Sequence, residues 1–196
     1  MIEVEIKLPV LSLEAVKIQL LALGFQEIGF EKERDTYFDN ALGMIRAADG
    51  ALRVRETEDG QTGSIRSQIN YKGKRMDART MTRQELETGV ENGEICRNIL
   101  RALGYFPVEP EVVKERVLLR QDTVTACLDR VRGLGEFLEL ETLTEREEDR
   151  ADALERIERI LKELGYQLSD TLRISYLSML QRKQFAKGGE KWNFRK

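Results

Sequence analysis

The sequence predicts an α+β fold in which antiparallel strands carry one apolar and one charged face. Its first seven residues, Met-Ile-Glu-Val-Glu-Ile-Lys, alternate strictly, and Glu3, Glu5 and Lys7 share one face. A strand turns successive side chains to opposite faces, so this pattern indicates a β-strand. The same alternation recurs down the chain, and the amphipathic helical segments between the strands are sufficient to cover the apolar faces.

Two architectures are compatible with these strands. In an open antiparallel sheet, the apolar face is protected and the charges lie in water. In a closed barrel of about eight strands with the helices packed outside, the charges line a lumen instead. Two details favour the barrel. The opposite faces are of the kind that helices cover, and the charged faces are mixed in sign and largely lack the Thr, Ser and Gln usual on solvated sheet faces.

The composition limits the classes of function. The 196 residues suit one domain with at most a small appendage. A net charge of -3 gives no reason to expect nucleic acid or an anionic membrane as partner. There is no histidine, so metal chemistry would have to use carboxylates, which suit Mg²⁺ or Mn²⁺. Cys96 and Cys127 match no metal or redox spacing and are expected to be reduced packing residues. Without a signal peptide or an apolar run of about 18 residues, a soluble cytoplasmic protein is expected.

The first half of the chain is expected to be mostly strands. Ser12 can cap a helix over residues 13–23 that ends at Gly24. Turn residues at 39–40, 49–50 and 59–63 separate the alternating segments, and residues 73–82 resemble a mobile basic loop. The strands are therefore expected at residues 1–8, 25–38, 51–58, 64–72 and 83–87.

The second half is expected to alternate strands with helices. A helix over 92–103 ends at Gly104, and Pro107 and Pro110 then lead into a strand over 112–120. Strands follow at 123–131 and 137–143. Residues 148–164 form the clearest amphipathic helix, and a last helical segment is expected over 169–183. Residues 1–183 are therefore expected to form one domain, and 184–196 a polar C-terminal tail.

The charged faces together suggest a site. Buried without water, such a lumen would be costly, but it becomes sensible if it holds water, metal ions and a polyanion. Carboxylates bind a hard divalent cation, and Lys and Arg bind phosphate oxygens. The charges, mostly two residues apart within a strand, are Glu3, Glu5, Lys7, Arg53, Arg55, Lys72, Arg83, Glu85, Glu87, Lys114, Arg116, Asp129, Glu139 and Glu141.

These residues resemble the motifs of one family. Glu3-x-Glu5-x-Lys7 is similar to the ExExK signature of the CYTH superfamily, also called triphosphate tunnel metalloenzymes. The match continues in family order over roughly residues 1–182. It includes Leu52-Arg53-Val54-Arg55, Tyr71-Lys72-Gly73, Thr82 to Glu87, Lys114-Glu115-Arg116, Leu128-Asp129 and Gly135 to Glu141. The segments Asp35 to Asp39, Gly133 to Phe137 and Ser175-Tyr176 most resemble the class IV adenylyl cyclase branch, which shares features with thiamine triphosphatases.

The resemblance implies an eight-stranded antiparallel tunnel that binds a nucleoside or inorganic triphosphate with Mg²⁺ or Mn²⁺. It implies Glu5, Glu139 and Glu141 as metal ligands, and Glu3 and Asp129 as catalytic groups that accept a proton or orient the nucleophile. Either Glu85 and Glu87 join the metal site, or they hold the wall together through ion pairs with Arg83. The triphosphate-binding set is Lys7, Arg53, Arg55, Lys72, Arg83, Lys114 and Arg116.

The expected activity is that of a class IV adenylyl cyclase, which converts ATP to cyclic AMP and pyrophosphate. Two alternatives stay open: an inorganic or thiamine triphosphatase that hydrolyses the terminal phosphate, and a non-catalytic module that binds polyphosphate or nucleotide. The expected partner is a small triphosphate (ATP, tripolyphosphate or thiamine triphosphate). A homodimer is also plausible, because the outer apolar faces can exceed what the helices cover.

Overall fold

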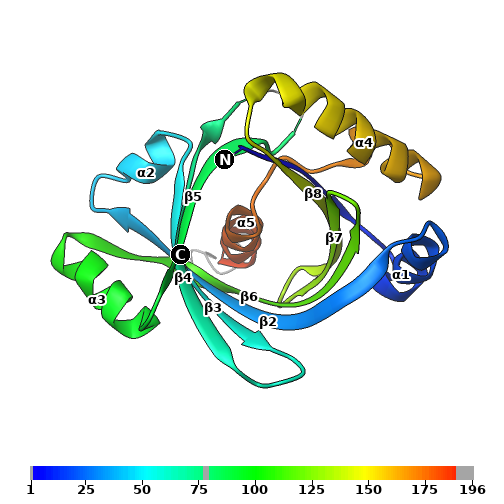
Figure 1. The fold of residues 1–196 in the computed structure, drawn as a ribbon. Helices are drawn as coiled ribbons and strands as arrows, with labels where there is room; N and C mark the ends of the chain where they lie inside the picture. The colour runs from blue at the N-terminus through cyan, green and yellow to red at the C-terminus, as the bar shows by residue number, and fades with distance from the viewer. Residues whose placement is uncertain (1, 77–79, 189–196) are drawn as a thin grey trace, which may run out of the picture.

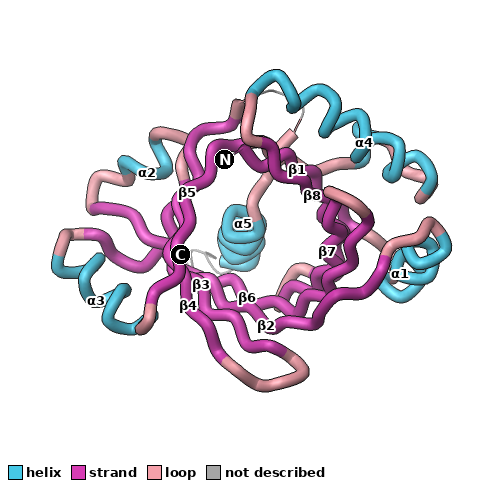
Figure 2. The backbone as a smooth tube through the Cα atoms, in the orientation of Figure 1, coloured by secondary structure: helices cyan, strands magenta, loops and turns pink. Residues whose placement is uncertain are grey.

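The strands close into an antiparallel barrel. The structure is a computed structural model that describes residues 2–76 and 80–188. Around the ring the strand order is β1-β5-β4-β3-β2-β6-β7-β8 (Figures 1 and 2), and β1 closes it by pairing with both β5 and β8. The strands are β1 (Ile2–Pro9), β2 (Gln26–Asn40), β3 (Ala51–Asp59), β4 (Ile65–Arg75), β5 (Arg83–Val90), β6 (Tyr105–Gln121), β7 (Val124–Val131) and β8 (Gly135–Thr144).

Four helices of the described part of the chain, α1 to α4, pack outside the ring, as the sequence predicts, and α5 lies over one end of the central cavity. In Figure 1, α1 and α4 flank one side, α2 and α3 flank the other, and α5 projects over the centre of the ring. None of the helices in the described ranges is long and apolar enough to cross a bilayer. Their bounds are α1 (Leu13–Ala22), α2 (Met44–Ala47), α3 (Gly93–Ala102), α4 (Arg150–Glu163) and α5 (Tyr176–Gly188), with 3-10 turns at Glu147–Asp149 and Leu168–Asp170.

The hydrophobic core lies between the barrel and the helices. Val4, Ile6 and Leu8 on the outer face of β1 are fully buried against Leu20 of α1 and Ile157 of α4. A smaller cluster under α3 is formed by buried residues of β2, β3 and the helix itself. The strands that helices cover, such as β1 and β3, therefore turn apolar side chains outward to a helix and charged side chains inward. This excludes the open sheet with charges in water and confirms the closed barrel.

Several element boundaries differ from those expected. Strand β6 begins at Tyr105, so Pro107 and Pro110 lie inside it. They are tolerated because β7 pairs with β6 only from Lys114 onward, which leaves this part of β6 an edge. The short helix α2 was not expected. The last helix starts at Tyr176, seven residues later than predicted.

The structure describes only part of two segments for which the sequence made predictions, the loop over residues 73–82 and the C-terminal tail over 184–196. In the expected mobile loop, β4 continues to Arg75. Met81 is buried, and its backbone N–H donates to the backbone carbonyl of Glu5 (3.0 Å). Helix α5 runs past Lys183 to Gly188, so the expected boundary at 183 falls inside a helix. Residues 189–196, and with them most of the predicted polar tail, lie outside the described residues.

Candidate functional site

The inner faces of the strands enclose a cavity of about 1030 Å³. Its wall includes every predicted site residue except Asp129. The charges divide the ring into two contiguous halves. The cationic half, on β3, β2, β6 and β7, holds Arg53, Arg55, Lys114 and Arg116 with the carboxylates Glu33, Asp35 and Asp129. The acidic half, on β8, β1, β5 and β4, holds Glu3, Glu5, Glu85, Glu87, Glu139 and Glu141 with Lys7 and Lys72.

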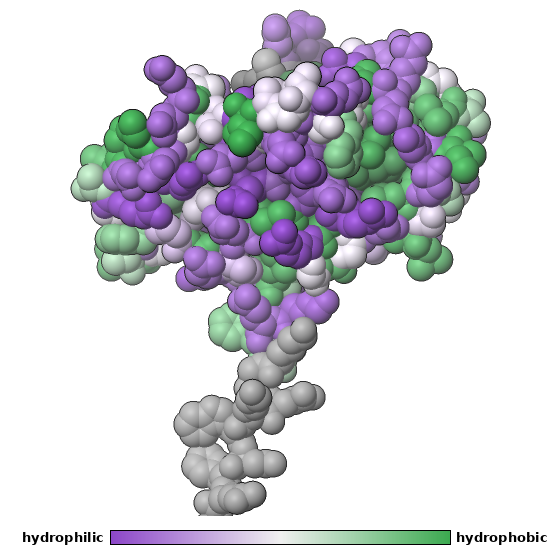
Figure 3. Space-filling view, turned by 90° about the horizontal axis from the view of Figure 1, so that it is seen from below, coloured by the Kyte–Doolittle hydropathy of each residue, from purple (hydrophilic) through white to green (hydrophobic). Residues whose placement is uncertain are grey.

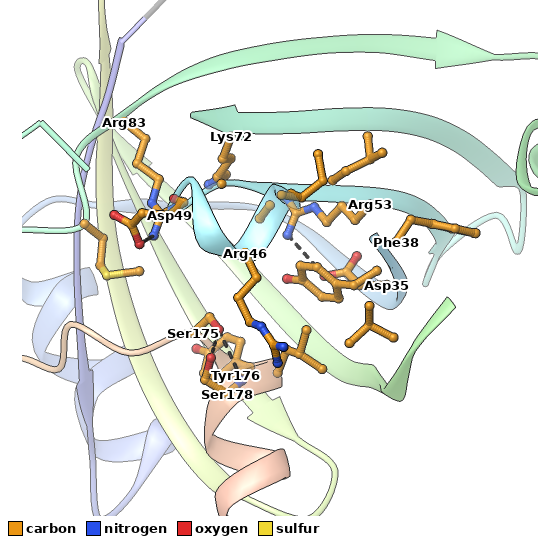
Figure 4. A pocket seen from close by; sticks show the side chains of 18 of the residues that line it. Asp35, Phe38, Arg46, Asp49, Arg53, Lys72, Arg83, Ser175, Tyr176 and Ser178 are labelled. Carbon is orange, nitrogen blue, oxygen red and sulfur yellow. Dashed lines mark hydrogen bonds and ion pairs between the residues drawn. The ribbon is translucent and has the colours of Figure 1, made fainter. Parts of the chain in front are cut away.

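In the cationic half, buried carboxylates orient the arginines. Asp35 accepts hydrogen bonds from Arg55 Nε (2.6 Å) and Nη2 (2.8 Å), and from Arg53 Nη1 (3.2 Å; Figure 4). Glu33 accepts from Arg55 (3.0 Å) and lies 3.0 Å from Lys114 Nζ. Burial alone would raise the pKa of Glu33, but Arg55 and Lys114 outweigh it and lower this pKa to about 2. The cations are thus fixed before any ligand arrives.

Asp129 lies behind this half and not on the cavity surface. It is fully buried, and it accepts from Arg116 Nε (2.6 Å), Lys114 Nζ (3.1 Å) and the Tyr176 hydroxyl (3.0 Å). Two cations and a phenol therefore occupy the carboxylate that the resemblance assigned to proton transfer. In this arrangement Asp129 positions Arg116 and Lys114.

Tyr176, at the start of α5, closes one end of the cationic half. Its ring lies 4.1 Å from Lys7 Nζ and 5.5 Å from Lys114 Nζ, and it packs edge-on against Phe137 at 5.1 Å between ring centres. An ammonium over an aromatic face is attracted by the ring quadrupole. Figure 4 shows this tyrosine beside Ser175 and Ser178, with Arg46 of α2 extending toward them.

The acidic half has more carboxylates than cations. The Lys72 ammonium contacts Glu3 and lies 3.4 Å from Glu5 and 3.9 Å from Glu85. Burial, together with Glu139 and Glu3, raises the pKa of Glu5 despite Lys72. Burial and the neighbouring carboxylates likewise raise the pKa of Glu141 to about 8.

Glu139 lies at the border of the two halves. It contacts Arg116 and lies 3.7 Å from Lys7 Nζ. Burial would raise its pKa, but Arg116, Lys114 and Lys7 outweigh burial and lower it well below the usual range. Glu139 is therefore ionised at neutral pH, whereas Glu141, with a pKa of about 8, is mostly protonated.

A divalent cation fits the chemistry of the acidic half, although its ligands are not preassembled. Among residues 2–76 and 80–188, no three carboxylates or other metal-ligating side chains form a ready cluster. Burial first, and then the neighbouring carboxylates, raise the pKa values of Glu5 and Glu141, and a bound cation would offset both effects. In addition, Asn70, whose amide donates to Glu85 and Glu87, has a buried Oδ1 without a hydrogen-bond partner, which is an oxygen of the kind that Mg²⁺ accepts.

Arg83 does not form the ion pairs with Glu85 and Glu87 that were one of the two alternatives for these carboxylates. Its guanidinium donates to the carbonyls of Asp49 (2.7 Å) and Gly73 (3.1 Å) and lies 3.6 Å from the Asp49 carboxylate. Figure 4 shows this pair at one end of the cavity. Glu85 and Glu87 instead accept from Asn70, which leaves them available to the acidic half.

Sequence reasoning missed Glu33, Asp35 and the roles of Tyr176 and Asp49. The signal for the first two was present, because Glu33 and Asp35 stand two residues apart on one face of β2. It was hidden because Lys32 and Arg34 on the opposite face turn the segment into an unbroken charged run. No local pattern marks Tyr176, since its role depends on where α5 meets the barrel.

Comparisons with known proteins agree with this geometry. The family model of the CYTH domain matches residues 1–176. The "Putative adenylate cyclase MJ0240" of Methanocaldococcus jannaschii is 36% identical over 179 residues, which is 91% of this chain and 98% of that protein. The structure of the PH1819 protein from Pyrococcus horikoshii superposes with a TM-score of 0.82 at 31% identity, covering 92% of this chain and 99% of that one.

A more distant structure shares the fold alone. It belongs to the Hippeastrum protein HpAC1, described as a "putative adenylyl cyclase" with a dominant triphosphatase activity. It has a TM-score of 0.63 at 18% identity, covering 93% of this chain and 95% of that one.

Proposed function

The chain belongs to the CYTH domain family, and from that premise we propose that it is a metal-dependent enzyme acting on a triphosphate bound in the cavity. The reaction we propose is the class IV adenylyl cyclase reaction, from ATP to cyclic AMP and pyrophosphate. The observation that carries the proposal is the cationic half, where buried carboxylates hold four cations in place along one wall. Such preoriented cations stabilise charge that develops on phosphate oxygens.

The triphosphate is proposed to lie along the cationic half. Arg53 supports this placement, because its Nε is buried without a hydrogen-bond partner, and a phosphate oxygen is a suitable acceptor. The proposed triphosphate-binding groups are Lys7, Arg53, Arg55, Lys72, Lys114 and Arg116. Arg83 is held by Asp49 and Gly73, so we assign it to shaping one end of the cavity.

The carboxylates of the acidic half are proposed to hold Mg²⁺ or Mn²⁺. The proposed ligands are Glu5, Glu139 and Glu141, with Glu85 and Glu87 next to them. A bound divalent cation would neutralise phosphate charge and lower the pKa of an attacking hydroxyl. This chain's own part is to supply these oxygens and to keep Glu139 ionised through Arg116 and Lys7.

Glu3 is proposed as the proton acceptor. In the cyclase reaction the ribose 3′-oxygen attacks the α-phosphorus, its proton passes to the acceptor, and pyrophosphate leaves. Glu3 lies on the cavity wall, whereas Asp129 is shielded from the cavity by Arg116 and Lys114. We therefore assign Asp129 to positioning those two cations.

A triphosphatase is the second candidate, because it needs the same cations and metal ligands. In that reaction water attacks the terminal phosphorus and phosphate leaves. HpAC1, which shares this fold, is described as a "putative adenylyl cyclase" with a dominant triphosphatase activity, and this keeps the triphosphatase open as a candidate for this chain. The non-catalytic module is disfavoured, because a pure binder has less need of the carboxylate set.

Product identification distinguishes these candidates. The pure protein is incubated with ATP, thiamine triphosphate or tripolyphosphate, each with Mg²⁺ or Mn²⁺, and the products are separated by chromatography. Cyclic AMP with pyrophosphate supports the cyclase, and a diphosphate with free phosphate supports the triphosphatase. Tight binding without turnover of any substrate would support the binding module and overturn both enzymatic proposals.

The metal assignment has a separate test in two variants. Glu5→Ala and Glu139→Ala are expected to lower metal-dependent turnover by about 10²-fold or more, since each removes a proposed ligand. Circular dichroism should show an intact fold for both. If both variants turn over at the wild-type rate, the assignment of the metal to this half is wrong.

A further inference from the structure

The Lys72 ammonium occupies the centre of the acidic half. It lies on β4 with its side chain 16% exposed, and it contacts Glu3 while lying 3.4 Å from Glu5. Within the described residues it is the only cation within 4 Å of either carboxylate. It is therefore the counter-ion that makes the burial of Glu3 and Glu5 tolerable.

A divalent metal and this ammonium compete for the same oxygens. Glu5 is a proposed metal ligand, and two cations held a few ångströms apart in a poorly solvated cavity repel each other strongly. The ammonium must therefore leave Glu5 before the metal can bind it. Lysine is suited to such a move, because it is a single charge on a flexible four-carbon stem.

We propose that Lys72 is a displaceable internal cation that makes metal binding depend on the triphosphate. Without triphosphate, Lys72 neutralises Glu3 and Glu5, and a metal ion must displace it. With triphosphate, Lys72 moves to a phosphate oxygen and exposes the carboxylates to the metal. Each ligand then favours the other, and linkage requires the coupling to be equal in both directions. This inference rests on the proposed function, since it needs a metal in the acidic half.

Metal binding without any triphosphate tests the proposal. Mn²⁺ is titrated into the wild type, Lys72→Met and Lys32→Met, with free Mn²⁺ followed by its paramagnetic resonance signal. Lys72→Met is expected to bind Mn²⁺ about tenfold or more tighter than the wild type. Lys32→Met is the matched control, because it removes the same charge from an exposed pair with Glu58 outside the cavity. Its Mn²⁺ affinity is expected to stay within about twofold of wild type.

The possible outcomes distinguish a failure of this inference from a failure of the proposed function. Equal or weaker Mn²⁺ binding by Lys72→Met overturns the role of Lys72, even when the wild type still binds tripolyphosphate. The proposed function is overturned instead if the wild type binds neither Mn²⁺ nor tripolyphosphate, even when both are present. Lys72→Gln serves as a second variant if thermal melting shows that Lys72→Met does not fold.

A second, independent observation concerns the outer face of α3. Ile95, Ile99 and Leu103 are four residues apart and are 57%, 55% and 68% exposed. Such spacing places them on one stripe of the helix. The opposite side already packs on the barrel through Leu100 and Cys96. In Figure 3, hydrophobic residues gather at the left edge of the molecule, the side where Figure 1 places α3, and also at the right edge.

Nothing among the described residues indicates what covers this stripe. The exposed charges Glu94 and Arg101 lie on the other side of α3, about half a helical turn away from the stripe, so the stripe carries no proposal.

Discussion

The two halves of the cavity bury charge in opposite ways. In the cationic half each buried carboxylate meets at least two cations: Asp35 between Arg53 and Arg55, and Asp129 between Lys114 and Arg116. In the acidic half, Glu3, Glu5 and Glu85 share one lysine. The first half is electrostatically complete without a ligand, and the second is not. The barrel thus combines a preformed anion-binding wall with a wall that favours an added cation.

The largest effect should follow from removing a carboxylate of the complete half. Asp35→Ala leaves the buried Arg55 and Arg53 without their partner, which is expected to destabilise the fold by about 3 kcal/mol or more. Urea denaturation measures this change. The control is Glu115→Ala on the outer face of β6, where the exposed pair with Arg130 is expected to contribute less than about 1 kcal/mol. If the two variants lose the same stability, the buried pairs of the cationic half contribute no more than an exposed surface pair.

Removing a carboxylate charge from the acidic half should instead stabilise the fold. The pKa of Glu141 is raised to about 8, so above its ordinary value of 4.5 the unfolded chain loses this proton while the folded chain keeps it. The stability of the metal-free protein therefore falls as pH rises from about 4.5 to 8 through this group. Glu141→Gln removes that penalty and is expected to raise the melting temperature by a few degrees at pH 8.

The pH series provides the control for Glu141. At pH 4 the side chain is protonated in both states, so wild type and Glu141→Gln should melt at similar temperatures. Glu33 should behave in the reverse manner, since its pKa is lowered to about 2 and its stabilisation is lost as pH falls from 4.5 toward 2. A Glu141→Gln variant that is less stable than wild type at pH 8 would contradict the excess of negative charge.

The smallest effect should come from the hydroxyl that links α5 to the cationic half. Tyr176→Phe removes the hydrogen bond to Asp129 but keeps the ring beside Lys7 and Phe137. Asp129 retains its two cations, so a loss of about 1 kcal/mol is expected, measured by thermal or urea unfolding. Tyr176→Ala also removes the ring and should lower the free energy of unfolding further. If both variants lower it by the same amount, the ring contributes nothing to stability.

The sequence by itself determined which faces of which strands carry charge. Side chains alternate with a period of two, so Glu3, Glu5, Arg53 and Arg55 could be assigned to the inner face without knowing their partners. Of the predicted site residues, all but Asp129 line the cavity. Strand ends were less predictable, because Pro107 is acceptable in β6 only where β7 is absent.

Only the tertiary structure decided which charges meet. Arg116 reaches Glu139 across β7, and Lys72 reaches Glu3 from 69 residues away, because barrel closure and strand register bring these faces together. The same register hides Asp129 behind Arg116 and leaves Glu141 among other carboxylates. Alternation is a property of each strand, whereas pairing depends on every strand between two residues. The sequence therefore determined the kind of site, and the closed barrel decided how its charges are divided.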